Sequence, residues 1–325
     1  MTRVPAHAGS LRLSERLAFV LMFMTMAAFV VGLSVLAAKF GGRAVTTATS
    51  SANSRTDQVG RQGQQSLPLA LTPASGLAKH SSSAQRNAAR LSAALRSALG
   101  SDRTRLSVGV EDTATGATAL YQSVRHYDTA SIAGTDILEA LLYQHQAAGT
   151  SVSNLDRRLA ARMIENGSGA ATARLWRAIG RAPGLLAANR ALGLQDTMPG
   201  TGYAWRLTTT TVTDQLQLLA TLAADRSALT SADRQYAIGL MAKVTAPAQR
   251  FGVPAAASRD MSSLVSDGCL EISHRWVVNS IGVIPDNGHD LLVVVLSQGW
   301  LTKAQGITAV RLAAIAAAGV LAASH

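Results

Sequence analysis

The sequence predicts a mixed α/β domain of the α+β type, in which strands lie near both ends and helices fill the middle. Leu106, Val108 and Val110 recur at every second position, which is the period of a strand. Apolar residues then recur at helical spacing through much of residues 135–233. Apolar runs rich in valine return at residues 276–297, so a helical block separates two groups of predicted strands.

The N-terminal part of this domain is predicted to be a helix followed by a hairpin. Residues 84–99 carry leucines and arginines on opposite sides at helical spacing, which is the pattern of an amphipathic helix. Residues 106–110 and 118–122 are predicted strands. The turn between them is the Asp-Thr-Ala-Thr-Gly segment at residues 112–116.

The C-terminal part is predicted to be a second hairpin and a last helix. Residues 276–284 and 290–297 form the strands, and a Pro-Asp-Asn-Gly segment at residues 285–288 forms the turn. Residues 303–322 form the helix. Since isolated hairpins are marginally stable, we expect the N- and C-terminal segments to pack together in one unit.

The balance of charge limits the classes of partner. The chain has 325 residues and a formal net charge of +11, and most of this surplus lies in the N-terminal third. Nucleic-acid binding is excluded, because aromatic residues for base stacking make up only 4% of the chain. A basic tether suits an anionic membrane surface or cell-wall polymer. The alternative is an arginine-rich composition that has no ligand.

An uncharged apolar run at residues 17–38 begins at Leu17 and ends at Ala38. As a helix it spans about 33 Å, which is enough to cross a bilayer core. We therefore predict a cytoplasmic tail (residues 1–16), a single-pass signal anchor (17–38), a Ser/Thr/Gln-rich disordered linker (39–83) and an extracytoplasmic domain (84–325). The alternative is secretion after cleavage of a signal peptide.

One position near Ser131 dominates the functional interpretation. Ser131 follows the segment Tyr-Asp-Thr-Ala and opens a helical run. This segment resembles the start of the catalytic helix in class A β-lactamases and the related penicillin-binding proteins, serine hydrolases in which the nucleophile opens the motif S-x-x-K. In that family the lysine one turn later helps to activate the serine hydroxyl. This chain has Gly134 at the lysine position.

The resemblance extends from about Ala84 to the last helix and implies a fold. The family has one antiparallel sheet covered by the first and last helices, with an all-helical subdomain inserted. It also implies the positions of two further motifs, both of which have lost their characteristic residues. The Ser-Asp-Asn motif corresponds to Gly167, Ser168 and Gly169. The Lys-Thr/Ser-Gly motif corresponds to Ser266, Asp267 and Gly268.

The family's omega loop carries the glutamate that activates the deacylating water. The resemblance places this loop at residues 194–206, before a threonine-rich helix start at residues 207–211. The only acidic residue in the loop is Asp196.

The lysines of the chain are Lys39, Lys79, Lys243 and Lys303, and no serine stands three residues before any of them. Loss of a general base alone typically removes a factor of about 10²–10⁴ in rate. The resemblance and these losses together predict a noncatalytic binding or scaffold module at the cell envelope. Its cleft is expected to bind a peptidoglycan fragment or an envelope protein.

Two alternatives remain for Ser131. In the first, the chain is an active hydrolase of the β-lactamase or peptidase type, and Ser131 is activated by a non-standard base such as Glu165, Asp136 or His126. In the second, the Ser131 hydroxyl only caps the start of a helix. No metal or cofactor is expected, because the seven histidines are scattered and none lies four residues from another beside a carboxylate.

Overall fold

The computed structural model describes residues 74–224, 227–257, 263–285 and 289–322. Within the chain, Ala70–His325 forms one compact unit. The predicted cytoplasmic tail, the predicted signal anchor and most of the predicted linker lie outside the described residues.

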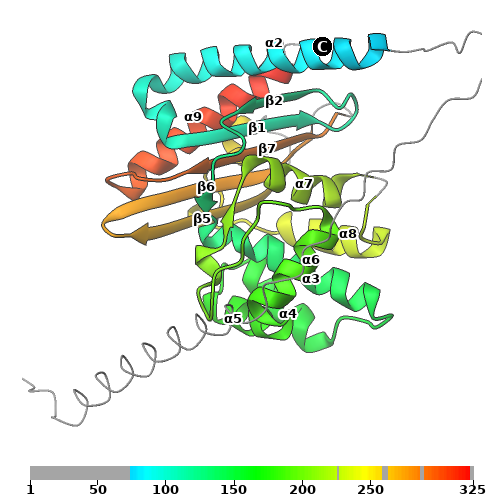
Figure 1. Ribbon diagram of the computed structural model, residues 1–325. Coiled ribbons are helices and arrows are strands. Elements are labelled where there is room, and N and C mark those ends of the chain that lie inside the picture. The colour runs from blue at the N-terminus through cyan, green and yellow to red at the C-terminus, as the bar shows by residue number, and fades with distance from the viewer. Residues whose placement is uncertain (1–73, 225–226, 258–262, 286–288, 323–325) are drawn as a thin grey trace, which may run out of the picture. The chain divides into compact units, whose positions relative to one another are not determined.

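A five-stranded antiparallel sheet is the centre of the domain, and its strand order is β2-β1-β7-β6-β5 (Figure 1). The strands are β1 (Leu106–Asp112), β2 (Thr118–Tyr121), β5 (Leu264–Ile272), β6 (Arg275–Ile284) and β7 (Leu291–Ser297). Strand β1 pairs with β7, so that Val108 lies opposite Val295. The N-terminal and C-terminal parts of the domain therefore share one sheet, as the sequence predicts.

Two long helices cover one face of this sheet (Figure 1). They are α2 (Ala74–Leu99) and α9 (Lys303–Ala322). Leu91 and Leu95 of α2 pack with Val110 and Val293 of the sheet and Ala313 of α9 in one buried cluster. The expected cover of first and last helices is thus present.

Helix α2 begins at Ala74, whereas the sequence predicted a linker up to residue 83. The extension contains serine and alanine and has no apolar stripe. A helix that is already nucleated by packed residues can propagate through such a segment at low cost, and this leaves no periodic signal in the sequence.

The helical subdomain packs against the opposite face of the sheet (Figure 1). Trp176 and Leu138 from its helices share a buried cluster with Ile281 and Val294 from the sheet. Its helices are α3 (Ala133–Ala147), α4 (Asn154–Ile164), α5 (Gly169–Ala178), α6 (Arg181–Leu192), α7 (Val212–Ala223) and α8 (Ser231–Met241).

Helix α9 begins with a side-chain cap, and it is both long and apolar. The Thr302 hydroxyl accepts from the Gln305 N–H and the Gln305 side chain accepts from the Thr302 N–H, both at 3.2 Å, which is a reciprocal helix cap. Among the described residues, α9 is the one helix long and apolar enough to cross a membrane by length and composition. Half of its apolar window is nevertheless buried within the domain, as in a core helix.

Candidate functional site

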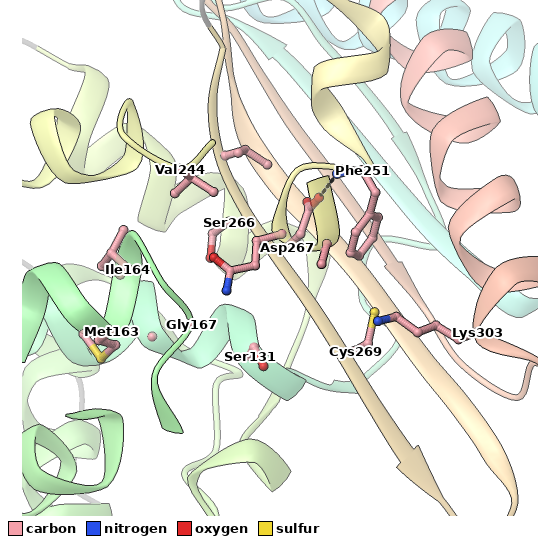
Figure 2. Close-up of a pocket in the computed structure, with 14 residues that line it drawn as sticks. Ser131, Met163, Ile164, Gly167, Val244, Phe251, Ser266, Asp267, Cys269 and Lys303 are labelled. Carbon is pink, nitrogen blue, oxygen red and sulfur yellow. Dashed lines mark hydrogen bonds between the residues drawn. The ribbon is translucent and has the colours of Figure 1, made fainter. Parts of the chain in front are cut away.

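A cavity of about 160 Å³, here called the cleft, lies between strand β5 and the helical subdomain (Figure 2). It brings together residues from all three degenerate motifs. The predicted positions that line it are Ser131, Gly134, Gly167, Ser266 and Asp267. Ser168 and Gly268 are next to lining residues in the sequence, but neither they nor Gly169 line the cleft.

Ser131 lies in a 3-10 turn, η2 (Ala130–Ile132), that leads directly into α3. Neither η2 nor α3 begins with a side-chain cap, so the helix-capping role considered for the Ser131 hydroxyl is wrong. The preceding residue, Ala130, has a φ of 52°, in the left-handed region that non-glycine residues rarely adopt. Such strain persists only where the surrounding structure imposes it.

Asn279 on β6, the strand between β7 and the edge strand β5, imposes the position of this turn. Its side-chain amide donates to the Asp128 carbonyl at 2.8 Å and to the Thr129 carbonyl at 3.0 Å. Its side-chain oxygen accepts from the Ser297 N–H at 2.9 Å. Because Asn279 is fully buried, this one side chain joins the Ser131 segment to two strands of the sheet.

Gly268 on β5 lets the sheet approach the backbone of the same turn. A β-carbon at residue 268 would lie 2.7 Å from the Ser131 nitrogen and 2.8 Å from the Ile132 nitrogen. These distances leave no space for a side chain. The requirement for glycine at this motif position is therefore met, although the lysine at the start of the motif is absent.

The lysine position of S-x-x-K has an apolar environment. A β-carbon at Gly134 would lie 3.5 Å from Met163 Cγ and 3.7 Å from Ile164 Cδ1, which are ordinary van der Waals contacts. Met163 and Ile164 also line the cleft. The position beside Ser131 therefore lacks the base, and the atoms nearest to it are apolar.

The Gly-Ser-Gly segment forms a turn, as the sequence predicts. Gly167 has a φ of 60°, and the Ser168 hydroxyl accepts from the Ala171 N–H to cap α5. The side chain of Gln249, from the 3-10 turn η4 (Pro247–Gln249), occupies the space beside Gly167. A β-carbon at residue 167 would lie only 2.3 Å from Gln249 Nε2. Gln249 thus takes space that a side chain at residue 167 would need.

Asp267 is oriented away from Ser131 and serves the structure. Its carboxylate accepts from the Gly252 N–H at 3.0 Å, from the Phe251 N–H and from the Ser280 hydroxyl. Burial raises the pKa of Asp267 to about 6, although these hydrogen bonds oppose the shift. The carboxylate therefore holds residues 251–252 against the sheet and offers no positive charge to a ligand.

Lys303, in the first turn of α9, is the one lysine that lines the cleft among the described residues. Cys269 packs against the α2/α9 core, and in Figure 2 it lies with Lys303 across the β5 ribbon from Ser131. Burial raises the pKa of the Cys269 thiol to about 11, while the Lys303 charge lowers it. Lys303 thus lies near the Cys269 thiol and does not replace the positive charge that is missing at Gly134.

None of the alternative bases considered for Ser131 lines the cleft. The Glu165 carboxylate forms an ion pair with Lys243 at 3.7 Å, and His126 is exposed. Asp136 is fully buried and accepts from Gln215 Nε2 at 3.3 Å. In the omega loop, Asp196 is exposed and likewise does not line the cleft.

The omega loop itself is closed by Asp214 near the start of α7. The Asp214 carboxylate accepts from the Gln195 and Asp196 N–H groups and from the Thr197 hydroxyl, at 2.7–3.1 Å. The helix begins at Val212 after the threonine-rich segment, as predicted. Asp214 therefore anchors the loop, whereas Asp196, the acidic residue within the loop, is exposed to solvent and does not line the cleft.

Two carboxyl groups of α3 are buried inside the domain. Asp136 and Glu139 are fully buried, and within the part of the chain that the structure describes, Asp136 Oδ2 and both Glu139 carboxyl oxygens have no hydrogen-bond partner. Burial raises the pKa of Asp136 to about 7, and the Asp214 charge adds to this shift. Burial also raises the pKa of Glu139 well above its usual value. Asp136 was considered only as a base for Ser131, and sequence reasoning did not identify the pair that it forms with Glu139.

We predict opposite stability effects for two glycine substitutions at the cleft. Gly134→Ala should stabilise the domain by about 0.5–1 kcal/mol, because a helical glycine is replaced where a methyl group fits. Gly268→Ala should destabilise it by about 1–3 kcal/mol, because the methyl group collides with backbone. Urea unfolding of both variants measures the difference. A large destabilisation by Gly134→Ala would mean that this position is under tight packing constraint.

We predict that Asp136 makes the domain less stable as the pH rises. Its pKa is near 3.9 in the unfolded chain and about 7 in the folded one, so the folded state retains a proton between these values. Stability then falls as the pH increases from about 4 to about 7. Asp136→Asn removes this titration and should stabilise the domain at pH 8 by up to about 4 kcal/mol, since each pKa unit corresponds to about 1.4 kcal/mol.

Urea unfolding at pH 5 and pH 8 tests this, with Asp196→Asn as the matched control, since Asp196 is exposed. The control substitution should leave the free energy of unfolding unchanged at both pH values. An Asp136→Asn variant that loses equal stability at both pH values would contradict the prediction.

The sequence matches no family model and no curated protein. Its structure is similar to that of a β-lactamase from Chitinophaga pinensis, with 14% identity and a TM-score of 0.62 over 73% of this chain and 99% of that one. It is also similar to a class A β-lactamase from Bacteroides cellulosilyticus, with 13% identity and a TM-score of 0.64 over 73% of this chain and 99% of that one. A third similar structure is a mutant of the class A β-lactamase of the last common ancestor of Gram-negative bacteria. Its identity is 19% and its TM-score is 0.61 over 72% of this chain and 100% of that one. The domain therefore has a β-lactamase-like fold.

Proposed function

We propose that this chain is a membrane-anchored, extracytoplasmic protein whose β-lactamase-like domain has lost catalysis and acts as a binding or scaffold module at the cell envelope. Residues 17–38 would supply the anchor and residues 39–73 the tether. The cleft would bind a peptidoglycan fragment or a segment of an envelope protein. No metal or cofactor enters the proposal.

The observation that carries the proposal is the environment of Gly134. In the family that the motif resembles, a lysine at this position takes part in removing the serine proton. Here the position faces Met163 and Ile164, and Ser131 has no neighbouring base among the residues that line the cleft on its side of β5. A serine hydroxyl at neutral pH is a weak nucleophile without such a base.

The size of the cleft supports the same conclusion. Pockets that hold drug-sized ligands have volumes of about 300–1,000 Å³. The cleft has a volume of about 160 Å³, and Gln249 occupies part of the space beside Gly167. A bicyclic β-lactam would need η4 to move, whereas a peptide side chain or a small polar group would fit the cavity as it is.

We predict that the purified protein forms no lasting acyl-enzyme with a fluorescent penicillin. Acylation requires an acceptor for the Ser131 proton while the ring is attacked and a donor pair for the oxyanion, and the acceptor is missing. Gly134→Lys should remain unlabelled, because the apolar wall and the missing relay groups still oppose the reaction and such sites are strongly non-additive. Gel fluorescence and intact-mass measurement detect the adduct.

An active class A β-lactamase serves as the positive control, and Ser131→Ala as the matched negative control. Covalent labelling of the wild-type chain that disappears in Ser131→Ala would overturn the proposal. It would favour the alternative, an active hydrolase with a base outside the family pattern. Labelling that persists in Ser131→Ala would place the adduct on another residue and leave Ser131 unreactive, as proposed.

A further inference from the structure

The surface on the far side of the sheet from the helical subdomain has an unusual charge distribution. It consists of the outward sides of α2 and α9, the two helices that cover this face of the sheet (Figure 1). Neither helix contains an aspartate or glutamate. The exposed residues that define this outer face are Arg86, Arg90, Arg96, Arg311, Leu312 and Ile315.

The apolar part of the outer face is a stripe along α9. Ile315 is 48% exposed and Leu312 is 37% exposed, and Leu301, just before the helix, is 63% exposed. The exposed polar residues between them are Thr302, Gln305, Thr308 and Arg311. Single exposed leucines are ordinary, but three large apolar side chains exposed along one helix and the residues that lead into it indicate an interaction surface.

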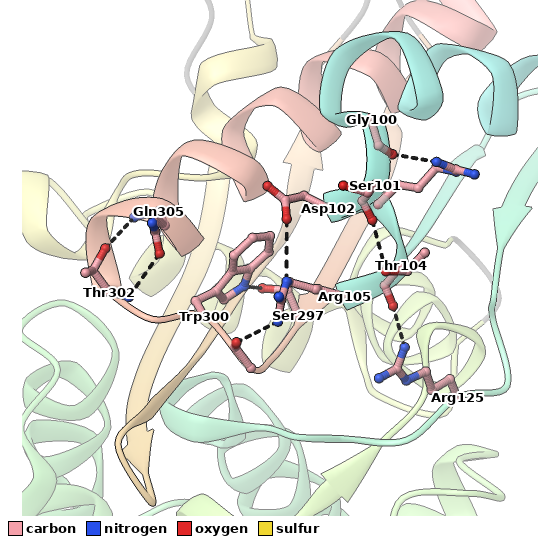
Figure 3. Close-up of polar contacts among 12 residues, drawn as sticks. Gly100, Ser101, Asp102, Thr104, Arg105, Arg125, Ser297, Trp300, Thr302 and Gln305 are labelled. Carbon is pink, nitrogen blue, oxygen red and sulfur yellow. Dashed lines mark hydrogen bonds and ion pairs between the residues drawn. The ribbon is translucent and has the colours of Figure 1, made fainter.

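A groove of about 510 Å³ joins the two helices at one end of the outer face. Leu99 of α2 lines one side, Leu301 and Leu312 line the other, and the buried Trp300 lies within it. Figure 3 shows that Arg105, at this end, is held by Asp102, and its guanidinium also donates to the Gly299 carbonyl. The carboxylate of Asp102 is thus neutralised locally, and the basic character of the surface is preserved.

We propose that the outer face docks on an anionic lipid bilayer. Leu301, Leu312 and Ile315 would enter the boundary between headgroups and acyl chains, which is the depth that interfacial amphipathic helices reach. Arg86, Arg90, Arg96 and Arg311 would contact lipid phosphates. This inference concerns a surface remote from Ser131 and does not depend on whether the cleft is catalytic.

The combination of charges and apolar side chains selects the partner. A soluble polyanion would pair with the arginines, but it would leave the leucine stripe in water. A bilayer satisfies both features, because a basic polar side and an apolar side are what peripheral helices present to anionic membranes. The absence of acidic residues from both helices removes the repulsion that would otherwise oppose anionic headgroups.

The test places an environment-sensitive fluorophore on the outer face of the full chain. In a Cys269→Ala background, Leu312→Cys carries the label, and Leu155→Cys carries it in a control, since Leu155 is an exposed leucine on α4. Each protein is reconstituted into vesicles of phosphatidylcholine alone or of equal parts phosphatidylcholine and phosphatidylglycerol. The test rests on the proposed anchor at residues 17–38, so co-flotation of the protein with the vesicles is measured first. In vesicles that carry the protein, the emission of the label reports docking locally.

We expect a blue shift and quenching by bromolipid at residue 312 only with phosphatidylglycerol, and loss of both at high salt. Changing Arg86, Arg90 and Arg96 to Gln should lower the docked-to-undocked ratio at least about tenfold. The matched control changes Arg158, Arg174 and Arg177, which are exposed on α4 and α5, to Gln and should leave the ratio unchanged.

Three results would overturn the proposal. The label at residue 312 could remain in water with both lipids, or the label at residue 155 could respond as strongly. A third is that soluble polyphosphate chains compete for the arginines while the label never leaves water, which would identify the surface as a polyanion site. Because wild-type protein in the two lipids gives an answer alone, misfolding of an arginine variant does not affect the conclusion.

Discussion

The buried amide of Asn279 is the interaction on which the geometry of the cleft depends. It pairs with two carbonyl groups of the segment before Ser131 and with a backbone N–H of β7. Loss of this side chain removes one hydrogen bond from each of three backbone groups, and a buried group left without any partner costs about 1–3 kcal/mol. The Ser131 turn is consequently held by the sheet, in a backbone conformation that Ala130 adopts only under constraint.

This clamp separates the scaffold of the cleft from its chemistry. Gly268 still allows β5 to approach the Ser131 nitrogen, and Asp214 still closes the omega loop. Both contacts stabilise the fold whether or not a substrate reacts. Gly134 and Ser266, in contrast, occupy positions where the resemblance implies lysines that act on substrate. The pattern of retained packing and changed charge is the basis of the proposed binding role.

The strands and terminal helices could be predicted because their signals are local and periodic. Helix α9 is found at the predicted residues 303–322, and β6 and β7 pair as far as Ile284 and Leu291, on either side of the predicted turn. Residues 286–288 of that turn lie outside the described residues. Positions in the cleft followed from the resemblance, which correctly brought Ser131, Gly167 and Ser266 together. The predictions of strands and helices depended on hydrophobic periodicity, and the predictions of the cleft residues depended on the resemblance to the motifs of class A β-lactamases.

Other features of the cleft have no such signal. Gln249 and Lys303 reach it from a short turn and from the first turn of a helix, and neither belongs to a motif. Burial of Asp136 and Glu139 depends on which side of α3 faces the subdomain core, and a helical pattern favours the exposure of charged residues. Tertiary packing determines these positions, so sequence periodicity alone could not assign them.

Helix α9 contributes differently on its two sides. The inner side buries Val310, Ala313 and Ala317 against the sheet, so the apolar character there follows from folding. On the outer side, Leu312 and Ile315 keep 37% and 48% of their surface in water, so folding accounts for only part of their apolar character. The proposed docking of the outer face on a bilayer would bury the remainder, beside the arginines of α2.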